Sequence, residues 1–191
     1  MQASLMAVIL AGGKSSRMGQ DKATRYSPKL QATLIEQSLS LLSQLDDCDV
    51  VISSNTYVNG IKDIIPDCGP LSGIHAVFSS KQSHSRLLEQ KHSRGFLFIP
   101  VDMPKLSVTL LEALILFAQQ NHCATYPNNS FLPCYVPAKA ELLSVLSQLL
   151  QGTDWSVRYL LEQLDARSMP WHEEKQLVNI NNPHDWQQHC I

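Results

Sequence analysis

The chain has 191 residues, of which 44% are hydrophobic and 17% are charged, and its formal net charge is −2. This length favours a single domain, with enough hydrophobic residues for a core that needs no metal or disulfide to fold. The charge is close to zero and no basic stripe is visible, which argues against nucleic acid as a partner. No hydrophobic run is long enough to cross a membrane.

The cysteine pattern indicates a cytoplasmic protein. Five cysteines are an odd number, and no two of them form a C-x-x-C pair. A disulfide framework or a structural zinc site is therefore not expected, and reduced thiols are the simpler interpretation. The hydrophobic run near the N-terminus has no basic flank, so we interpret it as a core strand rather than as a signal peptide.

That first hydrophobic run, Leu5–Ala11, predicts a fully buried strand. A loop over 12–22 follows, with three glycines that allow tight turns and a close approach of the backbone to a ligand. Lys14, Arg17 and Lys22 add positive charge to the same loop. Backbone amides and cations at short range are what a triphosphate requires, so we predict a phosphate-binding loop here. Its spacing fits neither the P-loop pattern nor the dinucleotide-binding G-x-G-x-x-G pattern.

Hydrophobic runs alternate with helical patterns along the rest of the chain, which predicts β-α-β units and a mostly parallel sheet. Further strands are predicted over about 49–53, 62–65, 95–101, 124–127, 131–136 and 177–180. Helices are predicted over about 31–45, 69–80, 107–121, 138–151 and 154–164. Ser107 and Asn182 are expected to cap helices, and the polar segment 82–94 is expected to be a surface loop.

Polar or glycine-rich segments follow four of the predicted strands. They are the loop over 12–22, Asn55, Asp67 with the segment 69–73, and Asp102. In an open α/β sheet, ligands bind in the crevice outside the carboxyl ends of the strands, so we expect these segments to meet at one binding site. Asn55 and Asp67 are candidates for holding a nucleoside, although residues of these types also form ordinary turns.

Asp102 is the candidate metal ligand. It directly follows a hydrophobic strand and lies between Pro100 and Pro104, which restrict the backbone around it. Mg²⁺ prefers one or two carboxylates together with phosphate oxygens and waters, so this carboxylate suits a nucleotide-bound Mg²⁺. The other interpretation, that Asp102 caps the next helix, is less favoured because Ser107 is the better cap.

The pattern L-A-G-G-x-S-x-R-M-G-x-D-K, over residues 10–22, resembles the signature loop of nucleotidyltransferases, and in particular that of the molybdenum cofactor guanylyltransferases. The segments G-P-L-S-G at 69–73 and P-x-D-x-P at 100–104 resemble further motifs of this family. The resemblance implies a Rossmann-like, three-layer α/β/α fold with a mostly parallel central sheet, of the nucleotide-diphospho-sugar transferase type.

The same resemblance implies an enzyme that transfers GMP from GTP to the phosphate of molybdopterin and releases pyrophosphate, with Mg²⁺ as cofactor. It implies a single nucleotidyltransferase domain over 1–191, with a GTP-binding half over about 1–120 and an acceptor-side half over about 121–191. We expect a monomer in the cytoplasm that supplies its product to the apoproteins of molybdoenzymes.

The resemblance also assigns roles to single residues. Arg17, Lys22 and Asp102 would be catalytic, with Asp102 holding the metal and the two cations stabilising the departing pyrophosphate. The residues implied in substrate binding are Leu10, Ala11, Gly12, Gly13, Lys22, Asn55, Asp67, Gly69, Pro70, Leu71, Gly73, Asn179 and Asn181. Among these, the two asparagines belong to a segment that resembles the family's N-x-N-T-P motif near the pterin, with Asn182 where threonine is usual.

Several alternatives remain open from the sequence. The Gly12-Gly13 pair resembles the GTP-using branch, whereas relatives that use CTP tend to have L-A-A-G at this point. A cytidylyltransferase, another small-molecule nucleotidyltransferase, or a non-catalytic carrier of nucleotide and molybdopterin are the competing functions. Arg158 would meet the phosphate of the second substrate or form surface ion pairs. The segment 131–135 resembles the family only loosely, so its role in acceptor binding is open.

Overall fold

The computed structural model describes residues 5–12, 21–80, 95–139 and 141–191. The strands are β1 (Leu5–Leu10), β2 (Tyr26–Ser27), β3 (Ala32–Thr33), β4 (Cys48–Ser53), β5 (Gly95–Pro100), β6 (Thr125–Pro127), β7 (Cys134–Pro137) and β8 (Arg167–Met169). The helices are α1 (Leu34–Leu42), α2 (Gly69–Ser79), α4 (Val108–Asn121), α5 (Leu142–Leu149), α6 (Val157–Gln163), α7 (Pro183–Cys190) and the short 3₁₀ helix η1 (Glu174–Leu177).

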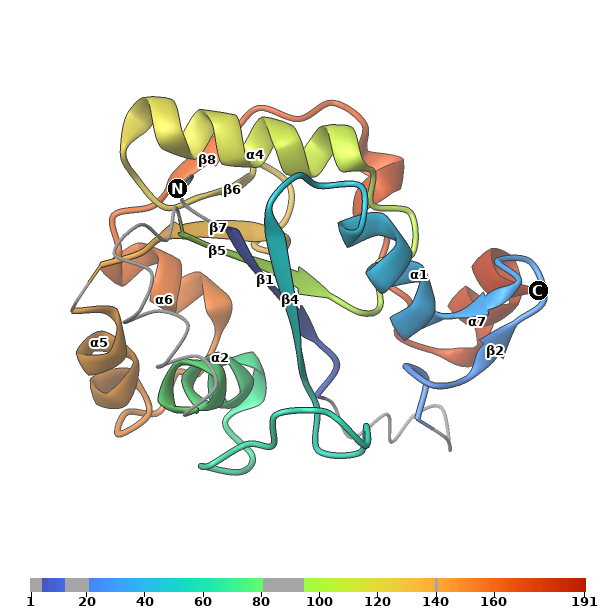
Figure 1. Cartoon of the computed structure of the whole chain (residues 1–191), viewed down its shortest axis with the longest axis horizontal. Coiled ribbons are helices and arrows are strands. Elements are labelled where there is room, and N and C mark those ends of the chain that lie inside the picture. The colour runs from blue at the N-terminus through green and yellow to red at the C-terminus, as the bar shows by residue number, and fades with distance from the viewer. Residues whose placement is uncertain (1–4, 13–20, 81–94, 140) are drawn as a thin grey trace.

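Six of the described strands form one sheet in the order β4-β1-β5-β7-β6-β8 (Figure 1). β1 pairs in parallel with both β4 and β5, and β6 pairs in parallel with β8. β7 pairs antiparallel with β5 and with β6. Within the described sheet, β7 is thus the one strand of reversed direction, and the predicted mostly parallel sheet is confirmed. β2 and β3 form a separate antiparallel pair.

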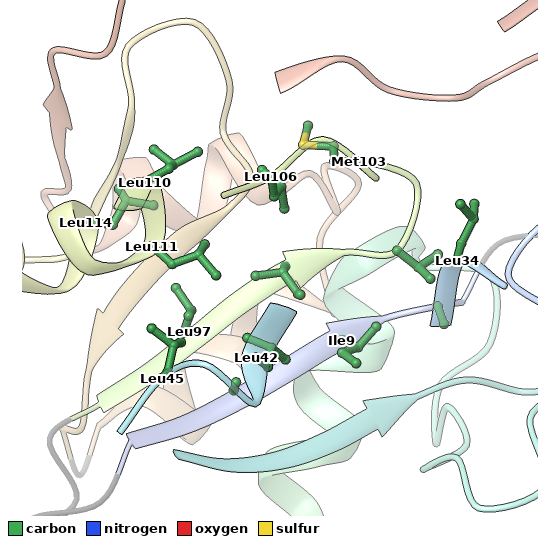
Figure 2. Packing of buried hydrophobic residues seen from close by; sticks show 14 of the residues in the cluster. Ile9, Leu34, Leu42, Leu45, Leu97, Met103, Leu106, Leu110, Leu111 and Leu114 are labelled. Atoms are coloured by element: carbon green, nitrogen blue, oxygen red, sulfur yellow. The ribbon is translucent and has the colours of Figure 1, made fainter. Parts of the chain in front are cut away.

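Helices cover both faces of this sheet, which confirms the predicted three-layer arrangement. In Figure 1, α1 and α4 lie on one face, and α2, α5 and α6 lie on the other. Alternate residues of β1 enter the two cores: Ala7 and Ile9 pack in the cluster of α1 and α4, and Met6 and Val8 pack in the cluster of α2, α5 and α6. Figure 2 shows the first cluster, where Ile9 of β1 and leucines of α1, α4 and β5 gather.

Every residue of β1 and of β5 is buried. A strand that is covered by helices on both faces is hydrophobic throughout, because neither of its faces meets water. This is why the continuous hydrophobic runs in the sequence predicted these two strands correctly. They form the centre of the sheet and direct their carboxyl ends to the same edge. In the described part of the chain, no helix is long and hydrophobic enough to span a membrane.

Two predicted strands are absent from the described structure. Residues 62–65 form no strand: Ile61 makes a single bridge to Ser53, and the side chains of Ile64 and Ile65 are 57% and 36% exposed. The strand was predicted because Ile64 and Ile65 are hydrophobic, but neither side chain is buried. The segment 177–180 is not a strand either, because Leu177 ends η1 and the amide of Ile180 donates to the carbonyl of Asp102 (2.9 Å).

Other boundaries shift by a few residues. The strand predicted at 131–136 begins only at Cys134, and β8 was not predicted, since its short R-S-M sequence is not hydrophobic enough to stand out. α5 and α6 are shorter than predicted at 138–151 and 154–164. Ser107 and Asn182 cap α4 and α7, as predicted. The predicted surface loop at 82–94 lies outside the described residues.

The helix predicted from Gln31 begins three residues later, at Leu34, because Thr33 is its N-cap. The Thr33 hydroxyl accepts from the amide of Glu36 (3.2 Å), and the Glu36 carboxylate accepts from the amide of Thr33 (2.7 Å). This reciprocal pair satisfies two backbone donors that the first helical turn leaves unpaired. It also fixes the point at which the β2–β3 pair passes into α1.

We predict that Thr33→Ala lowers the free energy of unfolding by about 1 kcal/mol, since the helix loses its cap. Denaturant unfolding measures this change. Ser43→Ala, at the other end of the same helix, is the matched control and is expected to change stability by less than about 0.5 kcal/mol. An unchanged or higher stability of Thr33→Ala would mean that Thr33 lies in the helix interior, as the sequence suggested.

Candidate functional site

A cavity of about 410 Å³ opens at the carboxyl ends of β1 and β5. Residues from both strand ends, from the start of α2, from the β6–β7 loop, from the start of α6 and from the C-terminal segment line it. They are Leu10, Gly12, Pro70, Pro100, Asp102, Met103, Ser130, Phe131, Leu132, Ser156, Val157, Arg158, Asn179 and Asn181. Six of the residues predicted for the site are in this set, namely Leu10, Gly12, Pro70, Asp102, Asn179 and Asn181.

The register of the two central strands brings these residues together. Leu10 of β1 lies opposite Pro100 of β5, so both strands end at the same level of the sheet. The amide of Val101 continues the pairing by donating to the carbonyl of Leu10 (3.1 Å). Asp102 is therefore the first residue after the last hydrogen bond between these strands, and it lies at the edge where ligands of α/β sheets bind.

Lys22 and Asp102 were both predicted as site residues and lie 80 positions apart in the sequence. They form an ion pair with 2.6 Å between Nζ and Oδ2. The same Lys22 ammonium donates to the carbonyl of Ile180 (2.8 Å). The two side chains are only 16% and 20% exposed, so water screens the pair less than it would screen a pair on the open surface. Lys22 thus joins the end of the glycine-rich segment, the end of β5 and the C-terminal segment at one point.

The backbone at Gly12 faces open space. A Cβ atom added at this position would have no neighbour within 4 Å among the described residues. Leu10 and Ala11 before it remain part of the sheet, since the amide of Ala11 donates to the carbonyl of Ser53 (2.8 Å). Gly13 and Arg17, the other two predicted residues of this loop, lie outside the described residues.

The N-terminus of α2 also points to the cavity, with Pro70 in its first turn. Gly69 has a φ of +57°, a left-handed conformation that favours glycine. Cys68, at the N-cap, makes no side-chain hydrogen bond to this turn within the described structure. Uncapped amides and the helix dipole at this end favour an anionic ligand.

Leu71 and Gly73 were both predicted as binding residues, but they pack α2 against the rest of the protein. Leu71 is fully buried in the core, and its side chain does not line the cavity. A Cβ atom at Gly73 would come within van der Waals overlap of the Ser53 hydroxyl, so glycine permits the close contact between α2 and β4. These two residues fix where the helix N-terminus lies.

Asn55 and Asp67 do not line the cavity. The side-chain amide of Asn55 donates to the Asp63 carboxylate (2.8 Å), and its oxygen accepts from the Asp63 amide (2.9 Å). Asn55 therefore closes the loop after β4, as an ordinary turn residue would. Asp67 is exposed, with a φ of 65°, immediately before α2. Their predicted contacts to a nucleoside stay predictions.

Asp185 holds Asn181 and its neighbour Asn182 in place. One of its carboxylate oxygens accepts from the amides of Asn181 (2.8 Å) and Asn182 (3.2 Å). The Asn182 side chain accepts in return from the Asp185 amide (3.0 Å), so this is a second capping box. Hydrogen bonds from the Asn181 amide lower the pKa of Asp185 from its usual value.

Arg158 fits both interpretations left open by the sequence. Arg158 lines the cavity, and its guanidinium lies 3.8 Å from the Asp154 carboxylate and 3.7 Å from the Glu162 carboxylate. The Arg158 side chain is 55% exposed, and exposed pairs of this length contribute little to stability.

Ser130, Phe131, Leu132, Ser156 and Val157 line the cavity but were not among the predicted site residues. The sequence signal that could have found Phe131 and Leu132 was the weak family likeness at 131–135. Ser156 and Val157 directly precede Arg158, the residue of this stretch that the sequence suggested as a candidate.

We predict that Asp185→Ala lowers the thermal unfolding midpoint at pH 7, because the start of α7 loses its carboxylate acceptor. The folded-state pKa of Asp185 is depressed, so the ionised carboxylate stabilises the fold above its unfolded pKa of about 3.9. This stabilisation is lost as the pH falls through the lower, folded-state pKa. The gap between wild type and variant should therefore narrow between pH 4 and pH 3 in thermal melts.

Asp46→Ala, which changes an exposed aspartate outside the site, is the control and should show no gap at either pH. A gap for Asp185→Ala that stays constant down to pH 3 would contradict the role of the carboxylate charge.

Comparison with known proteins agrees with this geometry. The MobA-like NTP transferase domain matches residues 7–168. A molybdenum cofactor guanylyltransferase from Xanthomonas euvesicatoria is 35% identical over 184 residues, which cover 94% of this chain and 90% of the relative. A probable molybdenum cofactor guanylyltransferase from Mycobacterium avium is 28% identical, with 95% and 92% covered.

Solved structures show the same fold. Molybdopterin-guanine dinucleotide biosynthesis protein A from Archaeoglobus fulgidus has a TM-score of 0.71 at 23% identity, with 96% of this chain and 95% of that chain covered. The 2-C-methyl-D-erythritol 4-phosphate cytidylyltransferase from Thermus thermophilus has a TM-score of 0.62 at 15% identity, with 98% and 97% covered. The predicted fold type is thus confirmed, and the chain is a nucleotidyltransferase that belongs to the MobA-like NTP transferase family, as its resemblance to the molybdenum cofactor guanylyltransferases implied.

Proposed function

We propose that this protein transfers GMP from GTP to the phosphate of molybdopterin and releases pyrophosphate. The observation that carries the proposal is the ion pair between Lys22 and Asp102, because Asp102 lines the cavity at the ends of β1 and β5. A cation and a carboxylate at this edge are what binding of a metal–triphosphate complex requires. The 35% identity to a molybdenum cofactor guanylyltransferase supports the choice of substrates.

The triphosphate would bind between Gly12, Lys22 and the N-terminus of α2. Gly12 has no side chain, so phosphate oxygens can approach the backbone there, and the α2 dipole favours their negative charge. Gly13 and Arg17 are proposed to complete this site from the loop that precedes Lys22.

The residues at the cavity fit a nucleotide-bound divalent metal, and we propose Mg²⁺. The described residues contain no group of three His, Cys, Asp or Glu side chains that could hold a metal by themselves. A site with one carboxylate, Asp102, is typical of Mg²⁺ that is held largely by phosphate oxygens and waters. When bound, the metal would neutralise charge on the phosphates, while Lys22 and Arg17 would stabilise the charge on the departing pyrophosphate.

The base and ribose would lie on the side of β1 and β4. We propose that Asp67, immediately before α2, contacts the nucleoside. Asn55 would reach the nucleoside only if its amide left Asp63, because both ends of that amide bind Asp63. The Gly12-Gly13 pair supports GTP rather than CTP as the donor.

The acceptor would enter from the side of the C-terminal half. Asn179, Asn181 and Arg158 line the cavity there with polar groups. Since the ion pairs of Arg158 are long and exposed, its guanidinium is available to bind the acceptor phosphate. An oxygen of that phosphate attacks the α-phosphorus of GTP, and the bond between this phosphorus and the pyrophosphate oxygen breaks. The attacking group is already ionised, so the reaction needs no general base, only positioning and charge stabilisation.

We further propose that the protein acts as a monomer in the cytoplasm and supplies its product to molybdoenzyme apoproteins. All five cysteines are free thiols, which supports a reducing compartment. The division into a GTP-binding half and an acceptor-side half at about residue 120 belongs to the same proposal.

The direct test incubates the purified protein with molybdopterin, Mg²⁺ and one of GTP, CTP or ATP. We predict that molybdopterin guanine dinucleotide and pyrophosphate form with GTP, and that CTP and ATP give little product. Chromatography of the dinucleotide and a pyrophosphate assay measure the outcome. Preferred use of CTP would instead identify a cytidylyltransferase, and tight binding of GTP and molybdopterin without any turnover would identify a carrier.

We also predict that Asp102→Asn and Lys22→Gln each reduce the rate of GMP transfer by a factor of about 10²–10³, which is typical for the loss of one charge that stabilises a transition state. Circular dichroism should show that both variants remain folded. Asp165→Asn and Lys29→Gln, at exposed positions away from the cavity, are the matched controls and should keep wild-type rates. Near-normal turnover of a folded Asp102→Asn protein would refute the metal assignment.

A further inference from the structure

Phe131 holds an aromatic ring at the cavity, although the sequence did not single it out. It lies on the loop between β6 and β7. Because β7 runs antiparallel to β5 and β6, this loop lies at the same edge of the sheet as the carboxyl ends of those two strands. Phe131 lines the cavity and is 40% exposed. The ring is therefore accessible to a ligand in the cavity.

The loop that carries Phe131 is fixed by two side-chain hydrogen bonds on its N-terminal side. The Asn129 side chain donates to the Glu174 carboxylate (2.8 Å), and the Asn128 side chain accepts from the amide of Trp171 (3.0 Å). The ring of Phe131 packs against Tyr126 of β6, with 5.3 Å between the ring centroids. One face of the loop is therefore anchored while the Phe131 ring borders the cavity, which is an arrangement that binds a ligand at low entropic cost.

The order of the strands places this ring on the acceptor side. Gly12 follows β1, Asp102 follows β5, and Phe131 precedes β7. In the sheet, β5 lies between β1 and β7 (Figure 1). Phe131 and Gly12 are therefore on opposite sides of β5. A nucleotide whose phosphates lie at Gly12 and Asp102 would reach α2 and β4 with its base. The ring of the second substrate would lie on the other side of Asp102.

We propose that Phe131 stacks on the flat aminopyrimidinone ring of the acceptor's pterin and thereby determines which acceptors are accepted, an inference that rests on the proposed function. A pterin has two apolar faces and an edge of hydrogen-bond donors and acceptors. The ring of Phe131 suits one face. The side-chain amides of Asn179 and Asn181, which line the same cavity, both donate and accept hydrogen bonds and suit the edge.

Three substitutions at Phe131 test this proposal. Phe131→Leu removes the ring but keeps most of the hydrophobic volume, and Phe131→Trp keeps a ring. Stacking of a heterocycle on an aromatic side chain is worth about 1–3 kcal/mol, so Phe131→Leu and Phe131→Ala should weaken acceptor binding about fivefold or more. Phe131→Trp should stay within about threefold of wild type. Leu116→Ala, a change of an exposed hydrophobic residue on α4, is the control and should have no effect.

Titration calorimetry with molybdopterin gives the acceptor affinity, calorimetry with GTP gives the donor affinity, and steady-state assays give both KM values and kcat. The expected result is a higher Kd and KM for molybdopterin with unchanged GTP affinity. Unchanged acceptor affinity in Phe131→Leu would overturn the proposal, and so would a loss confined to GTP. Pterin binding that is weakened in Phe131→Leu, in a protein that shows no GMP transfer, would support the stacking site while refuting the proposed function.

Discussion

The ammonium of Lys22 holds the site together, because it lies between the Asp102 carboxylate (2.6 Å) and the Ile180 carbonyl (2.8 Å). These three residues come from the segment after the glycine-rich loop, from the end of β5 and from the C-terminal segment. The Asp102 carbonyl also accepts from the amide of Ile180, so the last two segments are joined by backbone as well as by side chain. The walls of the cavity keep their relative positions through these contacts. Removal of either charge would leave the other one partly buried without its partner, which is costly in free energy.

The same two side chains are the ones that the proposed reaction needs. Without ligands, the positive charge of Lys22 and the negative charge of Asp102 compensate each other at the edge of the cavity. A triphosphate with its metal supplies both signs, so the lysine can bind phosphate oxygens and the carboxylate can bind the metal. Since Lys22 also holds the segment of Asn179 and Asn181 through Ile180, the donor side and the acceptor side of the cavity share one residue. Phe131 adds an aromatic surface on the acceptor side of this shared point.

The sequence correctly predicted those elements that are determined by their own residues, such as a continuous hydrophobic run or a helix cap. β1 and β5 are hydrophobic throughout and were found, and α4 was found because Ser107 caps it. Lys22 and Asp102 were predicted separately, one from a loop motif and one from its place after a strand. The weak predictions depended on packing. The isoleucines of 62–65 looked like a strand, but none of the described strands pairs with them and their side chains are exposed. Likewise, Phe131 lies at the cavity because β7 runs antiparallel to β5. The direction of a strand within a sheet cannot be predicted from the residues of that strand alone.

The central claim is that the Lys22–Asp102 pair is the place where the metal–triphosphate complex binds. A crystal structure of the protein with Mg²⁺ and a GTP analogue that cannot transfer GMP tests it most directly. The account predicts a metal ion coordinated by the Asp102 carboxylate and by phosphate oxygens, with the Lys22 ammonium within hydrogen-bond distance of the triphosphate. A nucleotide bound elsewhere on the molecule, or one bound at the cavity with its phosphates away from both side chains, would contradict the account.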